Sequence, residues 1–177
     1  EMTQHQLREK LGYVPQKGVL FSGTIDSNIR YGKPEITDAQ VKEAAEVAQA
    51  TEFIDTKPKK YESPVSQGGT NVSGGQKQRL SIARAIAKDP EIFIFDDSFS
   101  ALDFKTDSQL RKALKEYTKD ATTVIVAQRI STILGADQII VLDDGHMAGI
   151  GTHKELMANC EVYQQIARSQ LSEEELA

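Results

Sequence analysis

The stretch Asn71-Val72-Ser73-Gly74-Gly75-Gln76 decides how the rest of the chain is interpreted. The segment from Lys77 to Lys88 follows at once and carries apolar residues at helical spacing. Ser73 stands at the position of an N-cap, and Gln76 completes a capping-box pattern. The glycines allow close approach of another molecule, and a helix start offers free N–H groups and a positive dipole end. The stretch therefore predicts either a phosphate-binding helix N-terminus or an ordinary glycine-rich turn before a helix.

Length and composition limit the classes of protein to consider. The 177 residues, 39% of them hydrophobic, fit one domain or one domain with a small inserted subdomain. The charge is mildly acidic, with 26 Asp and Glu against 21 Lys and Arg, and no basic stripe favours a nucleic-acid partner. No apolar run approaches the roughly 20 residues of a membrane helix. The lone Cys160 excludes an internal disulfide and suits a reducing compartment, so we expect a soluble, intracellular, globular chain.

The residues after the central stretch alternate between apolar and amphipathic segments. Ile92-Phe93-Ile94-Phe95 is wholly apolar, which predicts a strand buried on both faces. We further expect a helix over 106–117, buried strands over 122–127 and 139–142, a hairpin turn at Asp144-Gly145 with a return over 146–150, and helices over 152–158 and 161–169. The acidic run 172–175 predicts a frayed, solvated helix end. This alternation predicts a largely parallel sheet with right-handed crossovers.

The residues before the central stretch predict shorter elements. Leu11-Gly12-Tyr13-Val14 is a strand candidate, and a helix can span 24–30. Thr37 opens a further helix, in which Gln40 completes a capping box. Residues 56–72 are rich in Lys, Pro, Ser and Gly and predict a loop.

Two carboxylates follow the most apolar strand directly. Asp96 and Asp97 come after Phe95, and ligands of such sheets bind beyond the carboxyl ends of the strands. The first carboxylate can hold Mg²⁺ through water, and the second can orient an attacking water. Taken alone, the pair fits an ordinary acidic strand end better. Gln128 occupies the matching place after the strand over 122–127.

These pieces occur along the chain in one specific order. Gln16 follows a strand, Ser73-Gly74-Gly75-Gln76 opens a helix, Asp96-Asp97 ends an apolar strand, and Ser100-Ala101-Leu102-Asp103 and Gln128 come after it. In this order the chain resembles the nucleotide-binding domain of ATP-binding cassette (ABC) transporters through nearly all of its 177 residues. The stretches most similar to the exporter branch, the multidrug and lipid type, are Tyr13-Val14-Pro15-Gln16, Leu20-Phe21-Ser22-Gly23-Thr24-Ile25 and Asn28-Ile29-Arg30-Tyr31-Gly32.

The resemblance implies an α/β fold. It would be a partial P-loop NTPase (RecA-like) core with a mainly parallel sheet and an inserted α-helical signature subdomain. Residues 1–23 would be a remnant of the core with the Q-loop, and residues 24–88 the helical subdomain with the signature motif. Residues 89–177 would form the second half of the core, with Walker B, the D-loop and the switch loop.

The resemblance also assigns roles to residues. Gln16 is similar to the Q-loop glutamine, which contacts Mg²⁺ and signals to the membrane domain. Asp96 resembles the Walker B aspartate, a metal ligand. Asp97 and Gln128 take the catalytic positions. The implied cofactors are ATP and Mg²⁺.

A second set of roles concerns contacts with other subunits. Ser73, Gly74, Gly75 and Gln76 resemble the signature motif, which reads the γ-phosphate of ATP held by a partner subunit. Residues 100–103 resemble the D-loop, so Asp103 is expected to bind nucleotide across the dimer interface. Gln67 falls in a loop that contacts the coupling helices of the membrane domains. The implied partners are ATP, membrane-spanning domains and a second nucleotide-binding domain, at the cytoplasmic face of the cell membrane.

Two residues depart from the family pattern within the same half-site. Asp97 stands where the family has a glutamate. The aspartate side chain is one methylene shorter and retracts the carboxylate by roughly 1 Å, a misplacement that can lower the rate about 10²-fold. Gln128 replaces the switch histidine and cannot carry an imidazolium charge. The signature is near consensus, with Val72 where Leu is commoner. The pattern is similar to the degenerate site of a heterodimeric exporter, in which this chain's own site is slow and its signature completes a competent site on the partner.

A third departure is the missing phosphate-binding loop. No Gly-x-x-x-x-Gly-Lys-Ser/Thr occurs, and the one Gly-Lys pair, Gly32-Lys33, precedes Pro34. The family places this Walker A loop ahead of Glu1, so we expect the chain to correspond to the C-terminal portion of such a domain. We expect weak or absent ATP binding and no hydrolysis by the isolated chain. Uncovered sheet surface would favour its self-association.

The function implied is the ATPase domain of an exporter, coupling ATP binding and hydrolysis to transport. One alternative is a regulatory half that supplies signature and D-loop contacts without turnover. Another is an ABC ATPase of DNA repair or translation, but the basic surface or long coiled-coil insertion expected there is not found in the sequence between Gln16 and Ser73. We expect Phe21 and Tyr31 to be packing residues. Cys160 and the three histidines, His5, His146 and His153, are expected to be structural or solvated rather than metal ligands.

Overall fold

The computed structural model describes residues 2–172 and divides the chain into two units, residues 1–126 and 127–177. Each unit has a hydrophobic core of its own. The helix end expected over 173–175 lies outside the described residues. The boundaries expected at residues 23 and 88 within the first unit remain predictions.

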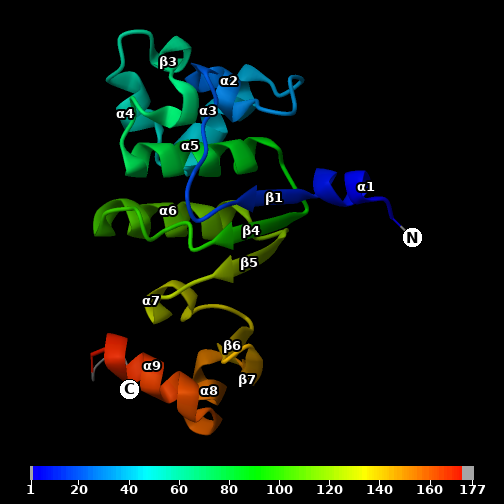
Figure 1. Ribbon diagram of the computed structural model, residues 1–177, viewed down its shortest axis with the longest axis vertical. Helices are drawn as coiled ribbons and strands as arrows, with labels where there is room; N and C mark the ends of the chain where they lie inside the picture. Colours follow the sequence, from blue (N-terminus) through cyan, green and yellow to red (C-terminus); the bar gives the residue numbers. More distant parts are fainter. Residues whose placement is uncertain (1, 173–177) are drawn as a thin grey trace. The chain divides into compact units, whose positions relative to one another are not determined.

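A parallel sheet forms the centre of the first unit. Among the described residues it contains β1 (Leu11–Val14), β4 (Ile92–Asp96) and β5 (Thr122–Val126), in the order β1-β4-β5 (Figure 1). The register sets Val14 opposite Phe95 and Phe95 opposite Ile125. The predicted α/β class and parallel pairing are confirmed, and each strand lies within one residue of its expected bounds.

Two long helices pack on one face of this sheet. They are α5 (Gly74–Ala87) and α6 (Phe104–Tyr117). Ser73 caps α5 through the predicted capping box, and Asp103 caps α6. The apolar faces of both helices share one core with Phe93 and Phe95 of β4. Figure 1 shows α5 between these strands and a group of shorter helices.

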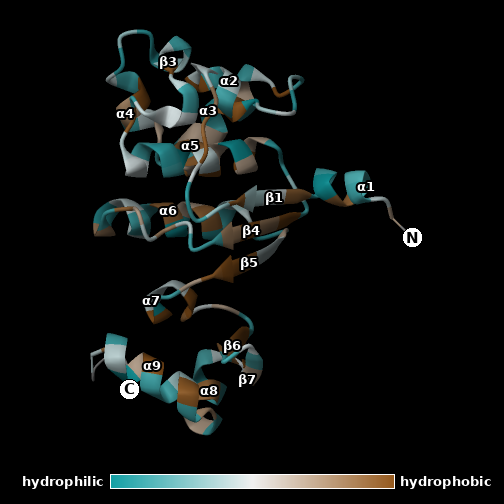
Figure 2. Cartoon of the chain, in the orientation of Figure 1, coloured by the Kyte–Doolittle hydropathy of each residue, from teal (hydrophilic) through white to brown (hydrophobic). Residues whose placement is uncertain are grey.

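The opposite face of the sheet is less covered than the sequence suggested. Phe93 and Phe95 are buried, but their neighbours Ile92 and Ile94 are only half-buried. In β5, Val124 and Val126 are 47% and 52% exposed. The expectation of strands buried on both faces is therefore wrong for the described unit. The reason is that α5 and α6 both pack on the side of the sheet to which Phe93 and Phe95 point. Figure 2 shows that β4 and β5 are hydrophobic along their length, so apolar residues also lie on the side that these helices do not cover.

Short elements complete the first unit. The helices are α1 (Gln4–Glu9), α2 (Ile25–Ile29), α3 (Asp38–Val47) and α4 (Thr51–Asp55), with 3₁₀ turns η1 (Lys60–Glu62) and η2 (Gln67–Gly69). The capping box of Thr37 and Gln40 at the start of α3 is present as predicted. The segment 56–72 is not all loop, because β3 (Pro64–Val65) pairs antiparallel with β2 (Gly23–Thr24). Strands of two residues carry no alternating pattern, so the sequence did not indicate them.

The second unit packs two helices on a hairpin. It contains α7 (Ile130–Ile133), β6 (Ile139–Asp143), β7 (His146–Gly151), α8 (His153–Asn159) and α9 (Glu161–Gln170). The predicted hairpin is confirmed, since Asp144 and Gly145 have φ of 45° and 78°, as a type I′ turn requires. The expected burial of the whole 139–142 strand is wrong. Ile139 and Val141 face Leu156 and Tyr163 in the core, whereas Ile140 is 58% exposed.

No helix within residues 2–172 combines the length and the apolar character needed to span a bilayer.

Tyr117 packs the end of α6 against the core of the first unit, and its ionisation can be used to test this contact. Its ring lies edge-on to Phe93, and burial raises its pKa to about 12. Because the folded chain resists ionisation of this phenol, its contribution to stability is complete below pH 10 and is lost as the pH rises towards 12. Tyr117→Phe should therefore reduce the fall in unfolding free energy between pH 10 and 12, measured by urea denaturation at each pH. If the unfolding free energy fell equally in the variant and the original chain, the burial of the Tyr117 hydroxyl would be contradicted.

Candidate functional site

The carboxyl ends of β1 and β4 bring several predicted site residues together. The two strands are parallel and paired up to Val14 and Phe95, so the segments that follow them leave the sheet at the same edge. Gln16 follows β1, while Asp96 ends β4 and Asp97 comes next. This edge is where α/β sheets bind their ligands.

A direct hydrogen bond joins two of these residues across the chain. The side-chain amide of Gln16 donates to Oδ2 of Asp97 at 3.0 Å, although the residues stand 81 positions apart. Gln16 is exposed and Asp97 is half-buried, so the pair lies at the surface. A carboxylate in this place can accept a proton or a hydrogen bond from a bound water, as an orienting group must.

The sequence did not single out Tyr13, which contacts the neighbouring carboxylate. Its hydroxyl donates to Oδ2 of Asp96 at 3.0 Å, and this hydrogen bond, followed by burial, raises the pKa of Tyr13. The register pairs Tyr13 with Ile94, two positions before Asp96. Because alternate residues share a face, Tyr13 and Asp96 lie on the same side of the sheet. Strand alternation combined with the register could have identified it.

The turn after β4 is held by hydrogen bonds to backbone carbonyls, donated by one backbone N–H and two serine hydroxyls. The N–H of Asp97 donates to the carbonyl of Val126 at 2.9 Å, and the buried hydroxyl of Ser98 donates to the carbonyl of Val14 at 2.8 Å. The hydroxyl of Ser100 donates to the carbonyl of Asp97 at 3.0 Å. Asp97 has a φ of 43°, in the left-handed region that Asp and Asn enter more readily than other side chains. The short carboxylate at 97 therefore suits the backbone it sits on.

The start of α5 presents the glycine-rich stretch to solvent. The Ser73 hydroxyl accepts the N–H of Gln76, and the Gln76 side chain accepts the N–H of Ser73, both at 3.2 Å. In a helix the N–H groups of the first turn, here those of Gly74 and Gly75, have no intrahelical acceptor. Ser73 and Gly74 are exposed. This geometry suits an anion brought by another molecule, as the predicted phosphate-reading role requires.

The segment 100–103 lies beside this helix start. A Cβ placed on Gly75 would be 3.5 Å from the carbonyl oxygen of Ala101 and 3.9 Å from the Leu102 side chain. Asp103 accepts the N–H of Thr106 at 2.9 Å and its hydroxyl at 2.7 Å. The backbone hydrogen bond is the main reason that the pKa of Asp103 is lowered. Asp103 is thus a helix cap in the described chain, and nucleotide binding by it stays a prediction.

The remaining predicted residues lie away from these contacts or in the other unit. Gln128 belongs to the second unit, where its carbonyl accepts the side chain of Gln170 at 2.9 Å, so its catalytic part stays a prediction. Gln67 begins η2, and its side chain accepts the N–H of Ser22 at 3.3 Å.

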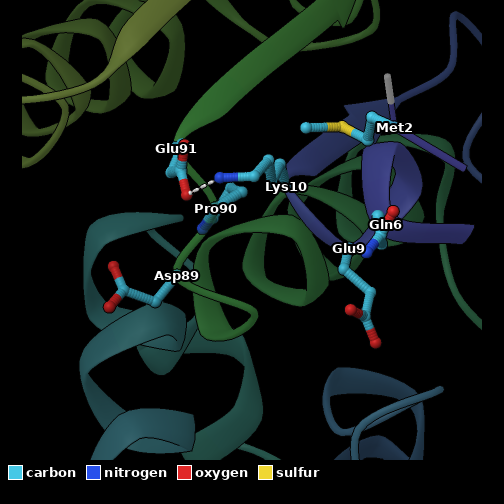
Figure 3. Close-up of a pocket in the computed structure, with 7 residues that line it drawn as sticks. All are labelled: Met2, Gln6, Glu9, Lys10, Asp89, Pro90 and Glu91. Carbon is cyan, nitrogen blue, oxygen red and sulfur yellow. Dashed lines mark hydrogen bonds and ion pairs between the residues drawn. The ribbon is translucent and has the colours of Figure 1, made fainter.

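A cavity of about 460 Å³ lies at the opposite ends of the strands (Figure 3). Its lining residues are Met2, Gln6, Glu9, Lys10, Asp89, Pro90 and Glu91. Lys10 forms an ion pair with Glu91 there. Because these residues precede β1 and β4, the cavity is separate from the edge that carries Asp96 and Asp97.

The donor atoms at the carboxyl edge suit Mg²⁺ delivered with a phosphate. Carboxylate and amide oxygens of Asp96, Asp97 and Gln16 are the hard ligands that this ion prefers. Within residues 2–172, no group of three or more His, Cys, Asp or Glu forms a complete protein metal site. Mg²⁺ bound through one or two carboxylates plus substrate phosphates needs no such group.

Comparisons with known proteins agree with this geometry. A family model described as ABC transporter matches residues 1–100. An uncharacterized ABC transporter ATP-binding protein of Mycobacterium tuberculosis is 46% identical over 173 residues, which is 96% of this chain and 29% of that protein. A Staphylococcus aureus protein named for multidrug export ATP-binding/permease function is 46% identical over 160 residues, 90% of this chain and 28% of that protein.

A solved structure is similar as well. The structure of a bacterial Atm1-family ABC exporter with ATP bound has a TM-score of 0.92 and 40% identity, covering 97% of this chain and 30% of that one. The chain thus spans less than a third of the length of the relatives it matches.

The capping box of α5 can be tested by mutation. Ser73→Ala removes the side-chain acceptor and should lower the unfolding free energy by about 1 kcal/mol, whereas Ser73→Asn keeps an equivalent cap and should change it little. Denaturant unfolding of the three chains measures both effects. Equal stability of Ser73→Ala and the original chain would show that the cap is not formed.

Proposed function

The chain belongs to the ABC transporter family, whose model matches residues 1–100, and from this premise we propose that it acts in the ATP-binding domain of an exporter. In this role it couples the binding and hydrolysis of ATP to transport across the cell membrane. The observation that carries the proposal is the hydrogen bond of Gln16 to Asp97, beside Asp96, at the ligand-binding edge of the sheet.

Residues of this edge have distinct roles in the proposed reaction. Asp96 would hold the Mg²⁺ that accompanies the nucleotide, and Gln16 would contribute its side-chain oxygen. Asp97 orients the attacking water. Gln128, which belongs to the second unit, is proposed as the switch residue of the family pattern. Held there, Mg²⁺ would supply neutralisation of the negative charge on the phosphate oxygens. Tyr13 holds the Asp96 carboxylate by its hydroxyl.

The start of α5 acts on a nucleotide held by a second subunit. Ser73 and the N–H groups of Gly74 and Gly75 contact its γ-phosphate, with the positive end of the helix dipole directed towards it. Gln76 keeps the helix start in place through the capping box. Asp103, in the adjoining segment, contributes at the same interface between subunits.

We further propose that this half-site is the slow one of a heterodimer. The carboxylate of Asp97 is one methylene shorter than that of glutamate, and Gln128 carries no charge near the phosphate. The left-handed φ of Asp97 is one that aspartate adopts more readily than most side chains. A second nucleotide-binding domain and membrane-spanning domains are the proposed partners, the latter contacted through the loop of Gln67 at the cytoplasmic face.

The same departures favour a second function, a regulatory half without turnover. In that case the chain binds nucleotide and completes the partner's site through Ser73 to Gln76, but hydrolyses nothing itself. Turnover measured separately at the two sites of the assembled transporter distinguishes the two functions.

Restoring the family residues tests the slow half-site. In the full-length protein assembled with its partner, Asp97→Glu together with Gln128→His should raise ATP turnover at this site by about 10²-fold, the factor that a misplacement of about 1 Å can cost. Turnover is measured with the partner's own site inactivated. Asp120→Glu, the same chemical change at an exposed residue outside the site, is the control and should have no effect. Unchanged turnover in the double variant would reject the assignment.

Nucleotide binding by the 177-residue polypeptide tests the role of the missing motif. Since these residues contain no Gly-x-x-x-x-Gly-Lys-Ser/Thr, we expect no stoichiometric binding of Mg²⁺-ATP in calorimetry. We also expect self-association in a parallel mass measurement, because Val124 and Val126 leave apolar surface exposed. Stoichiometric binding with micromolar affinity would mean that the polypeptide forms a nucleotide site without that loop.

A further inference from the structure

A buried amide on α5 holds the loop that carries Gln16. Gln78 is 2% exposed, and its side chain bridges both ends of this loop. Its Nε2 donates to the carbonyl of Pro15 at 3.1 Å, and its Oε1 accepts the N–H of Gly18 at 2.9 Å. The two residues between these contacts, Gln16 and Lys17, are exposed at the tip.

The loop backbone lies directly on the helix at Gly18. A Cβ built there would be 2.6 Å from the hydroxyl of Ser81 and 3.0 Å from the carbonyl of Lys77. The following residue is tied to the same helix, because the Arg84 side chain donates to the carbonyl of Val19 at 2.9 Å. Glycine at 18 is thus required by close approach, and the buried Gln78 amide depends on the loop for its partners.

Both partners in the Gln16–Asp97 hydrogen bond follow strands of the same sheet, but the loop of Gln16 has a further anchor on α5. Asp97 is fixed to the sheet by the bond from its N–H to Val126. Gln16 is fixed to α5 through the Gln78 bridge at the base of its loop. The helix that opens with Ser73 therefore sets where the Gln16 side chain stands relative to the carboxylate.

We propose that Gln78 is a positioning residue that clamps the loop of residues 15–18 to α5, so that a displacement of this helix moves Gln16 relative to Asp97. The start of α5 and the Gln16 loop then behave as one piece. The catalytic meaning of this link rests on the proposed function, whereas the clamp itself is a property of the described chain.

Loop order at Lys17 measures the clamp directly. We would place a nitroxide label on the chain through Lys17→Cys in a Cys160→Ala background and record its mobility by electron paramagnetic resonance. Gln78→Met keeps the length of the side chain but removes both hydrogen bonds. The population of the mobile label should rise roughly tenfold, the factor expected when two modest hydrogen bonds are lost. No nucleotide is involved, so the result is independent of the proposed function.

Matched variants separate the clamp from general loosening. Ser81→Ala changes an equally buried residue of α5 whose hydroxyl donates to Lys77 of the same helix, and it should leave the label unchanged. A label at exposed Lys105 should be insensitive to Gln78→Met. The proposal would be overturned if Ser81→Ala mobilised the Lys17 label as much as Gln78→Met does. It would also be overturned if Gln78→Met raised the mobility of the Lys105 label as much as that of the Lys17 label.

A change on the loop side provides a second route if Gln78→Met does not fold. Gly18→Ala forces a Cβ against the Ser81 hydroxyl and within 3.1 Å of Oε1 of Gln78, so it should mobilise the Lys17 label while the Gln78 side chain itself is kept. Adding Ser81→Ala removes the nearest clashing oxygen and should restore part of the order. A label that stays immobile in Gly18→Ala would show that contact with α5 does not order the loop.

Discussion

The burial of Phe93 and Phe95 is the interaction on which the rest of the first unit depends. The two rings stack on each other along β4, with Tyr117 against the first and Phe99 against the second. Truncating a buried phenylalanine typically costs about 3–5 kcal/mol, so this register is strongly fixed. Because alternate residues of a strand face opposite sides, it also determines the face on which Asp96 emerges. The same strand register therefore determines both the hydrophobic core and the position of the carboxylates.

Polar side chains of α5 then attach the segment after β1 to this core. Arg84 donates to the carbonyls of Val19 and Asn28 and lies over the rings of Phe21 and Tyr31, each at 5.3 Å. Burial lowers the pKa of its guanidinium, yet the group is hydrogen-bonded as a buried cation must be. The two rings stack with their centroids 4.1 Å apart, in line with the expected packing role, although Tyr31 is 55% exposed. One helix thus carries the glycine-rich stretch at its start and fixes the Gln16 segment along its length.

The sequence predicted what local patterns encode and missed what depends on register. The capping box of Ser73 and the positive-φ turn at Asp144 each follow from a few adjacent residues, and both are present. The family resemblance assigned Gln16 and Asp97 to one site, whereas their direct hydrogen bond was seen only in the structure. The contacts of Tyr13 with Asp96 and of Gln78 with Pro15 depend on how distant segments align, which no short window contains. The one-sided burial of β4 and β5 was missed for a similar reason, because apolar runs do not report how many faces are covered.

The open sheet face has a thermodynamic consequence. Apolar surface that is already exposed in the folded chain, at Val124 and Val126, adds nothing to the increase in heat capacity on unfolding. Typical domains gain about 12–15 cal/mol/K per residue, and we expect this chain to gain less. Its free energy of unfolding should then vary with temperature along a flatter curve, with cold and heat destabilisation both more gradual.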